Sequence, residues 1–69
     1  MTPLTQPQIR FLRRPQVEAR VGLKRTQIYD LMAAGDFPKT VKLGARAVAW
    51  IEAEIDAWVV ARVVATRAP

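Results

Sequence analysis

The chain of 69 residues contains neither cysteine nor histidine, and this absence narrows the folds open to it. A domain this small is often held together by disulfides or by a bound zinc ion, and both devices need these residues. The fold must therefore depend on the packing of one apolar core, because so short a chain cannot build two. Apolar residues make up 51% of the chain, which suffices for such a core.

The same absence argues against an enzyme. The common general base, the thiol nucleophile and the usual metal ligands are all missing. Three carboxylates, Glu52, Glu54 and Asp56, offer the elements of an acid/base pair. They fall in one predicted helix, however, where a solvated face is the ordinary interpretation. We expect no catalytic residues, no metal and no cofactor.

Positive charge is concentrated in the first two-thirds of the chain. The formal net charge is +5, and residues 1–50 hold nine Lys and Arg against three Asp and Glu. Such a surface suits a polyanion, with nucleic acid ahead of an anionic membrane. No apolar run is long enough to span a bilayer, and residues 1–10 lack the apolar stretch of a signal peptide. We expect a cytoplasmic protein.

Residues 10–65 form the predicted domain. Residues 1–9 show no apolar period and are interpreted as a flexible arm, and residues 66–69 are expected to fray. Residues 11–12 are a short apolar pair, interpreted as a strand or as a staple for the helix that follows.

Two short helices are predicted at residues 15–21 and 25–34. Pro15 suits the first position of a helix, and Gly22 and Gly35 suit helix C-termini that require positive φ. The short turn between the helices indicates a helix-turn-helix. Its apolar and glycine positions are filled by Val17, Val21, Gly22, Leu23, Ile28 and Leu31. The alternative is an ordinary helical hairpin in a small bundle.

Residues 40–50 alternate between apolar and polar or small side chains around Gly44, which predicts a β-hairpin with Gly44 providing the freedom of the turn. The hairpin is expected to be anchored by Val41, Leu43, Val48 and Trp50. A last helix is predicted at residues 51–65 from the spacing of Ile51, Ile55, Trp58, Val59 and Arg62.

The apolar face of this last helix is widened by Val60, Val63 and Val64. We interpret these valines as additional core packing, with a partner surface as the alternative. The predicted fold is mainly α with a small β-hairpin, a winged helix-turn-helix in the order helix, helix, hairpin, helix.

The candidate DNA-binding residues lie on the second helix and the hairpin. Hydrogen-bonding side chains crowd the start of the helix that would enter a major groove, and three cations lie along the hairpin. The candidates are Lys24, Arg25, Thr26, Gln27, Tyr29, Lys39, Lys42 and Arg46. Arg46 is two residues past Gly44, from where it can reach a phosphate or a minor groove; the alternative is a solvated charge. Trp50 and Trp58 are interpreted as core residues rather than base-stacking platforms.

The spacing of several motifs resembles that of the AlpA family of phage and prophage regulators over about residues 9–64. The matching residues are Phe11-Leu12-Arg13, Gly22-Leu23-Lys24-Arg25-Thr26-Gln27-Ile28-Tyr29, Gly35-Asp36-Phe37-Pro38, Val41-Lys42-Leu43-Gly44-Ala45-Arg46, Trp50, Glu54, Asp56 and Trp58. The resemblance implies a MerR-like winged helix-turn-helix and a DNA-binding transcription regulator, in some members an excisionase or its activator. It also implies that Lys24 to Gln27 and Tyr29 line the recognition helix and that Arg46 is the wing arginine.

Two residues depart from the family pattern. Lys24 stands where the family usually has a hydroxyl residue, and Thr40 where it often has a second proline. Because lysine cannot accept a capping hydrogen bond, we expect the second helix to start one residue late, with Thr26 as its cap.

The sequence therefore predicts sequence-specific binding to duplex DNA in the bacterial cytoplasm, at the nucleoid. A module this small makes few contacts, so we expect a dimer, cooperative binding, or a partner such as an integrase or RNA polymerase. The alternative is a small adaptor whose basic face meets an acidic protein. RNA binding ranks last, because exposed aromatic residues that stack on unpaired bases are lacking.

Overall fold

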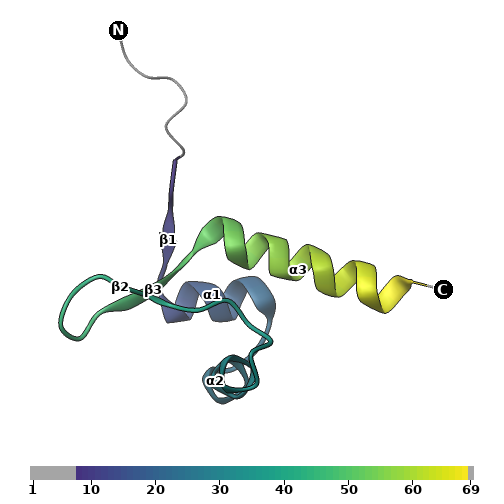
Figure 1. Cartoon of the computed structure of the whole chain (residues 1–69), viewed down its shortest axis with the longest axis horizontal. Helices are drawn as coiled ribbons and strands as arrows, with labels where there is room; N and C mark the ends of the chain where they lie inside the picture. The colour runs from purple at the N-terminus through teal and green to yellow at the C-terminus, as the bar shows by residue number, and fades with distance from the viewer. Residues whose placement is uncertain (1–7, 69) are drawn as a thin grey trace, which may run out of the picture.

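The computed structural model describes residues 8–68. Its elements are β1 (Phe11–Leu12), α1 (Arg14–Val21), α2 (Arg25–Ala33), β2 (Val41–Lys42), β3 (Val48–Ile51) and α3 (Glu52–Arg67). Figure 1 shows the three helices on one side of a small sheet, with the β2–β3 loop and the C-terminus at opposite ends. The predicted order of helix, helix, hairpin and helix is confirmed. Of the predicted arm at residues 1–9, all but the last two residues lie outside the described residues.

The sheet has three antiparallel strands in the order β1-β3-β2. Leu12 is paired with Trp50, and Lys42 with Val48. The backbone N–H of Glu52 donates to the carbonyl oxygen of Arg10 at 2.8 Å, which extends the β1–β3 ladder by one position. The apolar pair at residues 11–12 is therefore a strand, and it completes a sheet of which the predicted hairpin is one part.

Glycines with positive φ end both helices of the helix-turn-helix, as predicted. Gly22 has φ 72°, and its N–H donates to the carbonyl oxygen of Glu18 at 2.9 Å. Gly35 has φ 80°, and its N–H donates to the carbonyl oxygen of Met32 at 3.0 Å. Other residues adopt such backbone angles only with strain, so these two glycines fix where α1 and α2 stop.

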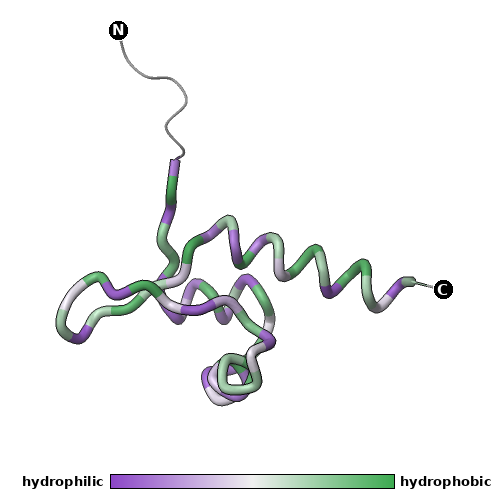
Figure 2. Tube along the Cα trace, viewed as in Figure 1, coloured by the Kyte–Doolittle hydropathy of each residue, from purple (hydrophilic) through white to green (hydrophobic). Residues whose placement is uncertain are grey.

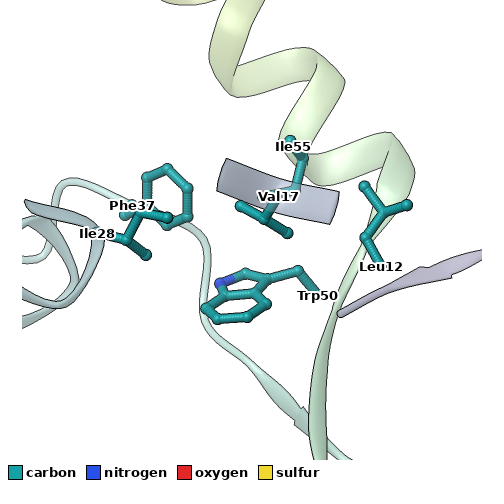
Figure 3. Close-up of a cluster of buried hydrophobic side chains, with 6 residues drawn as sticks. All are labelled: Leu12, Val17, Ile28, Phe37, Trp50 and Ile55. Atoms are coloured by element: carbon teal, nitrogen blue, oxygen red, sulfur yellow. The ribbon is translucent and has the colours of Figure 1, made fainter. Parts of the chain in front are cut away.

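The core draws one residue from every helix, from β1 and β3, and from the segment after α2. Its buried members are Leu12, Val17, Ile28, Phe37, Trp50 and Ile55 (Figure 3). Trp50 is completely buried, and its indole Nε1–H donates to the carbonyl oxygen of Pro38 at 3.1 Å. Trp58 is half-buried against Phe37, with ring centroids 4.8 Å apart. Both tryptophans thus belong to the core, as predicted.

The β2–β3 loop differs from the prediction in two ways. Leu43 does not anchor the hairpin, because 45% of its surface is exposed. Gly44 does not adopt a positive φ. The N–H groups of Leu43 and Gly44 both donate to the carbonyl oxygen of Ala47, at 2.7 and 3.3 Å. The chain therefore reverses over the short loop between Leu43 and Ala47, and no residue in this loop has a left-handed backbone.

Helix α3 follows β3 without a connecting residue, because Ile51 ends the strand and is also the N-cap of the helix. Ile55 is buried and Val59 half-buried, whereas Val60, Val63 and Val64 are exposed. The prediction that these three valines add to the core is therefore wrong. The reason is visible in Figure 1, where the last turns of α3 extend past α1 and α2.

An ionic cluster joins α1 to α3. The guanidinium of Arg20 donates to Glu52 Oε2 at 2.7 Å and to Asp56 Oδ1 at 2.6 Å. The hydrogen bond to Glu52, followed by that to Asp56, raises the pKa of Arg20. Two of the three carboxylates at the start of α3 are thus engaged by α1.

Candidate nucleic-acid interface

Helix α2 turns one face to the core and the other to solvent. Ile28 is buried, and Leu31 and Met32 are half-buried. Since successive residues of a helix are about 100° apart, the opposite face is formed by Thr26, Asp30 and Ala33, all exposed. Polar and small side chains thus cover the surface that would meet another molecule.

Helix α2 starts at Arg25 with Lys24 as its N-cap, so the expected late start with a Thr26 cap is wrong. The side chain of Gln27 satisfies a different backbone donor at this helix start, because its Oε1 accepts a hydrogen bond from the backbone N–H of Lys24 at 2.9 Å. Helix α1 starts in the same way, with Gln16 Oε1 accepting from the N–H of Arg13 at 2.8 Å. This is the glutamine half of a capping box, which requires no hydroxyl at the N-cap.

Three parts of the chain meet around a shallow surface hollow. It is lined by the start of α1, by α2 and by the β2–β3 loop and strand, through Arg13, Arg14, Pro15, Tyr29, Arg46 and Val48. The guanidinium of Arg25 lies over the ring of Tyr29, 5.8 Å from its centroid. Arg25, Tyr29 and Arg46 are therefore brought to one side of the molecule, although Tyr29 and Arg46 are 17 positions apart in the sequence.

The strand register places Lys42 on this same side. Lys42 lies directly opposite Val48, and residues opposite each other in an antiparallel pair project from the same face. Lys24, Thr26 and Lys39 are exposed, but they lie outside the hollow. We give the name basic face to the surface formed by Arg13, Arg14, Arg25, Tyr29, Lys42 and Arg46.

Sequence reasoning missed Arg13 and Arg14. The signal was present, since the two arginines directly precede Pro15 at the start of a predicted helix. Arg14 also forms an ion pair within α1, because its Nε donates to Glu18 Oε2 at 3.0 Å. This pair one helical turn apart holds the Glu18 carboxylate at the surface rather than between the two helices.

The carboxylates are distributed unevenly around the molecule. Arg10 and Arg20 form ion pairs with residues of α3, and Arg14 pairs with Glu18. Within residues 8–68, no carboxylate oxygen lies within 4.0 Å of the charged nitrogens of Arg13, Arg25, Lys42 or Arg46. The basic face thus carries four unpaired cations, and its potential attracts anions.

Two kinds of feature are absent from the part of the chain that the structure describes. Between residues 8 and 68 no group of His, Cys, Asp or Glu is arranged to hold a metal ion. In the same part of the chain, none of the helices combines the length and the apolarity that a membrane span requires.

Comparison with known proteins gives matches to phage and prophage proteins. Residues 10–63 match the family described as prophage CP4-57 regulatory protein (AlpA). The chain is 46% identical over 56 residues to "Uncharacterized protein ORF88" of Enterobacteria phage P4, which covers 81% of this chain and 64% of that protein. It is 43% identical over 56 residues to "DNA-binding transcriptional activator AlpA" of Escherichia coli strain K12, covering 72% of this chain and 80% of that protein. The chain thus spans less than two thirds of the length of the phage relative. No solved structure matches it at a significant level.

Proposed function

This chain belongs to the AlpA family of prophage regulatory proteins, and we propose that it binds specific sites in duplex DNA and regulates transcription. The observation that carries the proposal is the basic face, where four unpaired cations from α1, α2 and the β2–β3 hairpin point to one side. A related protein bearing the name of a DNA-binding transcriptional activator supports it.

In the proposed complex, α2 enters the major groove and the β2–β3 loop lies along the backbone as a wing. The major groove of B-form DNA is wide enough for one helix, and the outward face of α2 is free of bulky apolar residues. Arg13 and Arg46 line the hollow together with Tyr29, which supports a role for both in binding phosphates next to the inserted helix. Lys42 and Lys39 add charge along the wing.

Base recognition is assigned to Arg25, Thr26 and Gln27 at the start of α2. Arginine reads guanine through two donors, whereas glutamine reads adenine through one donor and one acceptor. Since Gln27 Oε1 already accepts the N–H of Lys24, this side chain offers DNA chiefly its amide donors. We therefore expect Arg25 to contribute most of the discrimination between sequences.

The salt dependence of DNA binding tests the proposal. The logarithm of the binding constant should fall linearly with the logarithm of salt concentration, by about 0.9 per phosphate contact. Arg46→Ala should remove about one such unit of slope and weaken binding to all duplexes alike. Arg25→Ala should instead reduce the preference for the selected site over competitor DNA.

Arg10→Ala is the matched control. It removes the same charge, but Arg10 lies 4.0 Å from Glu52 and its side chain is 77% exposed, so the ion pair contributes little to stability. Its salt slope should equal that of the unsubstituted protein. Equal slopes for Arg46→Ala and Arg10→Ala would show that binding follows net charge alone, and the basic face would lose its assignment.

The proposal includes a role in prophage excision, with an integrase or RNA polymerase as partner. A footprint over an attachment site beside a neighbouring integrase gene would support the excision role, and a footprint confined to a promoter would reject it. The competing adaptor function requires an acidic protein on the same basic face. If the basic face were built for an acidic protein, any DNA should displace that protein equally well, whatever its sequence. Displacement by a selected duplex but not by bulk DNA would therefore refute the adaptor function.

A further inference from the structure

The last turns of α3 present an apolar surface to solvent. Val60, Val63 and Val64 are 60%, 44% and 62% exposed. Figure 2 shows hydrophobic positions recurring along this part of α3, where it extends away from the rest of the chain. Scattered exposed apolar residues are ordinary, but three within two helical turns form a patch of the kind found at protein interfaces.

The helical state of this segment also needs an explanation. Valine is a poor helix former because its branched side chain loses rotamers against the preceding turn, and residues 59–64 include four valines. Helices of proteins are stabilised mainly by the packing of one face. Every residue from Val60 to Ala68 is exposed, so residues 8–68 supply little such packing beyond Arg62, which lies over the ring of Trp58. A second chain would supply it.

The spacing of the exposed residues is that of a helix–helix seam. Ala53, Asp56, Val60, Val63 and Arg67 are separated alternately by three and four residues. This repeat aligns side chains in one stripe that a second helix can cover. Ile55 and Trp58, which pack on the core, lie outside the stripe, so covering the stripe leaves the fold of the single chain intact.

We propose that α3 binds α3 of a second copy of this chain in antiparallel orientation, as a two-fold symmetric dimer. In this register Val60 faces Val63 of the second copy, and Asp56 faces Arg67 of the second copy. A parallel pair would instead place Asp56 against Asp56 and Arg67 against Arg67, which charge repulsion opposes. The opposite charges at the two ends of the stripe therefore favour pairing with a second copy of α3 and favour the antiparallel over the parallel orientation.

Asp56 is able to serve both its own chain and the second copy. Its Oδ1 accepts from Arg20 at 2.6 Å, while its other oxygen has no partner among the described residues, and the side chain is 54% exposed. The buried stripe spans only a few turns, so the dimer is weak in free solution and becomes strong when DNA holds two copies side by side. The inference rests on the proposed function only for this last step, where two-fold symmetry requires inverted half-sites.

Sedimentation equilibrium of the full chain without DNA, over a range of concentrations, tests the dimer directly. The unsubstituted protein should show a monomer–dimer equilibrium, and Val60→Asp should weaken it by roughly 10-fold or more. Ile9→Asp is the matched control, because Ile9 is 59% exposed against 60% for Val60 but lies before β1. It should leave the equilibrium unchanged.

A charge exchange gives a second readout. Arg67→Asp should weaken the dimer, and Asp56→Arg combined with Arg67→Asp should restore it, since Arg20 retains Glu52. Circular dichroism confirms that each variant is folded. A protein that stays monomeric at every concentration, a dimer unaffected by Val60→Asp, or a double variant no better than the single one would each overturn the inference.

DNA binding separates this failure from failure of the proposed function. Loss of the dimer in Val60→Asp with retained binding to a single half-site leaves the basic face intact, and only the cooperativity between inverted half-sites should disappear. Specific binding to direct repeats with the same cooperativity would reject the two-fold arrangement while retaining DNA recognition.

Discussion

Replacement of Trp50 should reveal how small the stability margin of this domain is. A protein of this length is expected to have a free energy of unfolding of about 3 to 10 kcal/mol. Trp50 is completely buried and contacts Phe37 edge-on with ring centroids 6.5 Å apart. Trp50→Ala removes these contacts and should cost about 3 to 5 kcal/mol, which is at least about a third of the available stability and, at the low end of its range, all of it.

Trp50→Phe separates the parts of this loss. It keeps an aromatic ring in the core but removes the Nε1–H that donates to Pro38, at a net cost of about 1 kcal/mol. The smaller ring should cost roughly 1 to 2 kcal/mol more. For a domain of this size, the combined loss corresponds to a fall in melting temperature of roughly 10 to 20 °C.

Thermal and urea unfolding followed by far-UV circular dichroism measures both variants, and the fluorescence of Trp58 reports on the environment of the remaining indole. Trp58→Phe is the control, because Trp58 is only half-buried although its Nε1–H also donates to a backbone oxygen, that of Asp36. It should cost less than Trp50→Phe. Equal effects of the two Phe variants, or a Trp50→Ala protein that melts like the unsubstituted one, would refute the assignment of Trp50 as the centre of the core.

Three further substitutions test local features of the chain by the same unfolding measurements. Gly22→Ala should cost about 1 to 2 kcal/mol because φ is 72°, although a Cβ there would meet no atom within 4 Å. Gly44→Ala is the control and should be neutral or slightly stabilising, because its φ is not positive. Equal effects of the two substitutions would contradict the backbone explanation. Gln27→Ala should lose about 1 kcal/mol with the cap of α2, and Gln27→Glu should retain it, since a carboxylate accepts the same hydrogen bond; a Glu variant as unstable as the Ala variant would exclude the capping role. Arg20→Gln should lower the melting temperature more at low salt than at high salt, because two ion pairs to α3 are lost; a loss independent of salt would indicate packing instead.

The elements and most of the core were predictable because they depend on local patterns. Gly22 and Gly35 mark helix ends through their backbone freedom, and both have the expected positive φ. The stripe of Ile28, Leu31 and Met32 predicted the inner face of α2. The sequence pattern alone was enough to predict these helix ends and this helix face, because each depends on residues that lie close together in the sequence.

The errors concern contacts that depend on where an element ends in space. Leu43 and Val60 continue correct local patterns, yet the hairpin and α3 both extend past the body of the domain, so these side chains have nothing to pack on. The cap of α2 was missed for a different reason. The prediction rested on the side chain at the N-cap itself, whereas the hydrogen bond at this helix start comes from Gln27, whose Oε1 accepts the backbone N–H of Lys24.

The basic face was predictable only in part. Arg25, Lys42 and Arg46 were identified as single cations, and their position on one side depends on the register of β2 with β3 and on the hollow beside Tyr29. Arg13 joins them because α1 begins beside the sheet, a consequence of the β1–β3 pairing that no local pattern reveals. The direct contacts of these residues with DNA remain predictions.

The continuous passage from β3 into α3 has a mechanical consequence. Ile51 belongs to the strand and caps the helix, so no connecting residue separates the β2–β3 hairpin, which we propose lies along DNA, from the helix that we propose binds the second copy. One inserted residue at this junction would turn the helix by about 100° and swing its valine stripe off the two-fold axis. In the proposed dimer, the direct connection between β3 and α3 would therefore fix both the distance and the rotational phase between two bound half-sites.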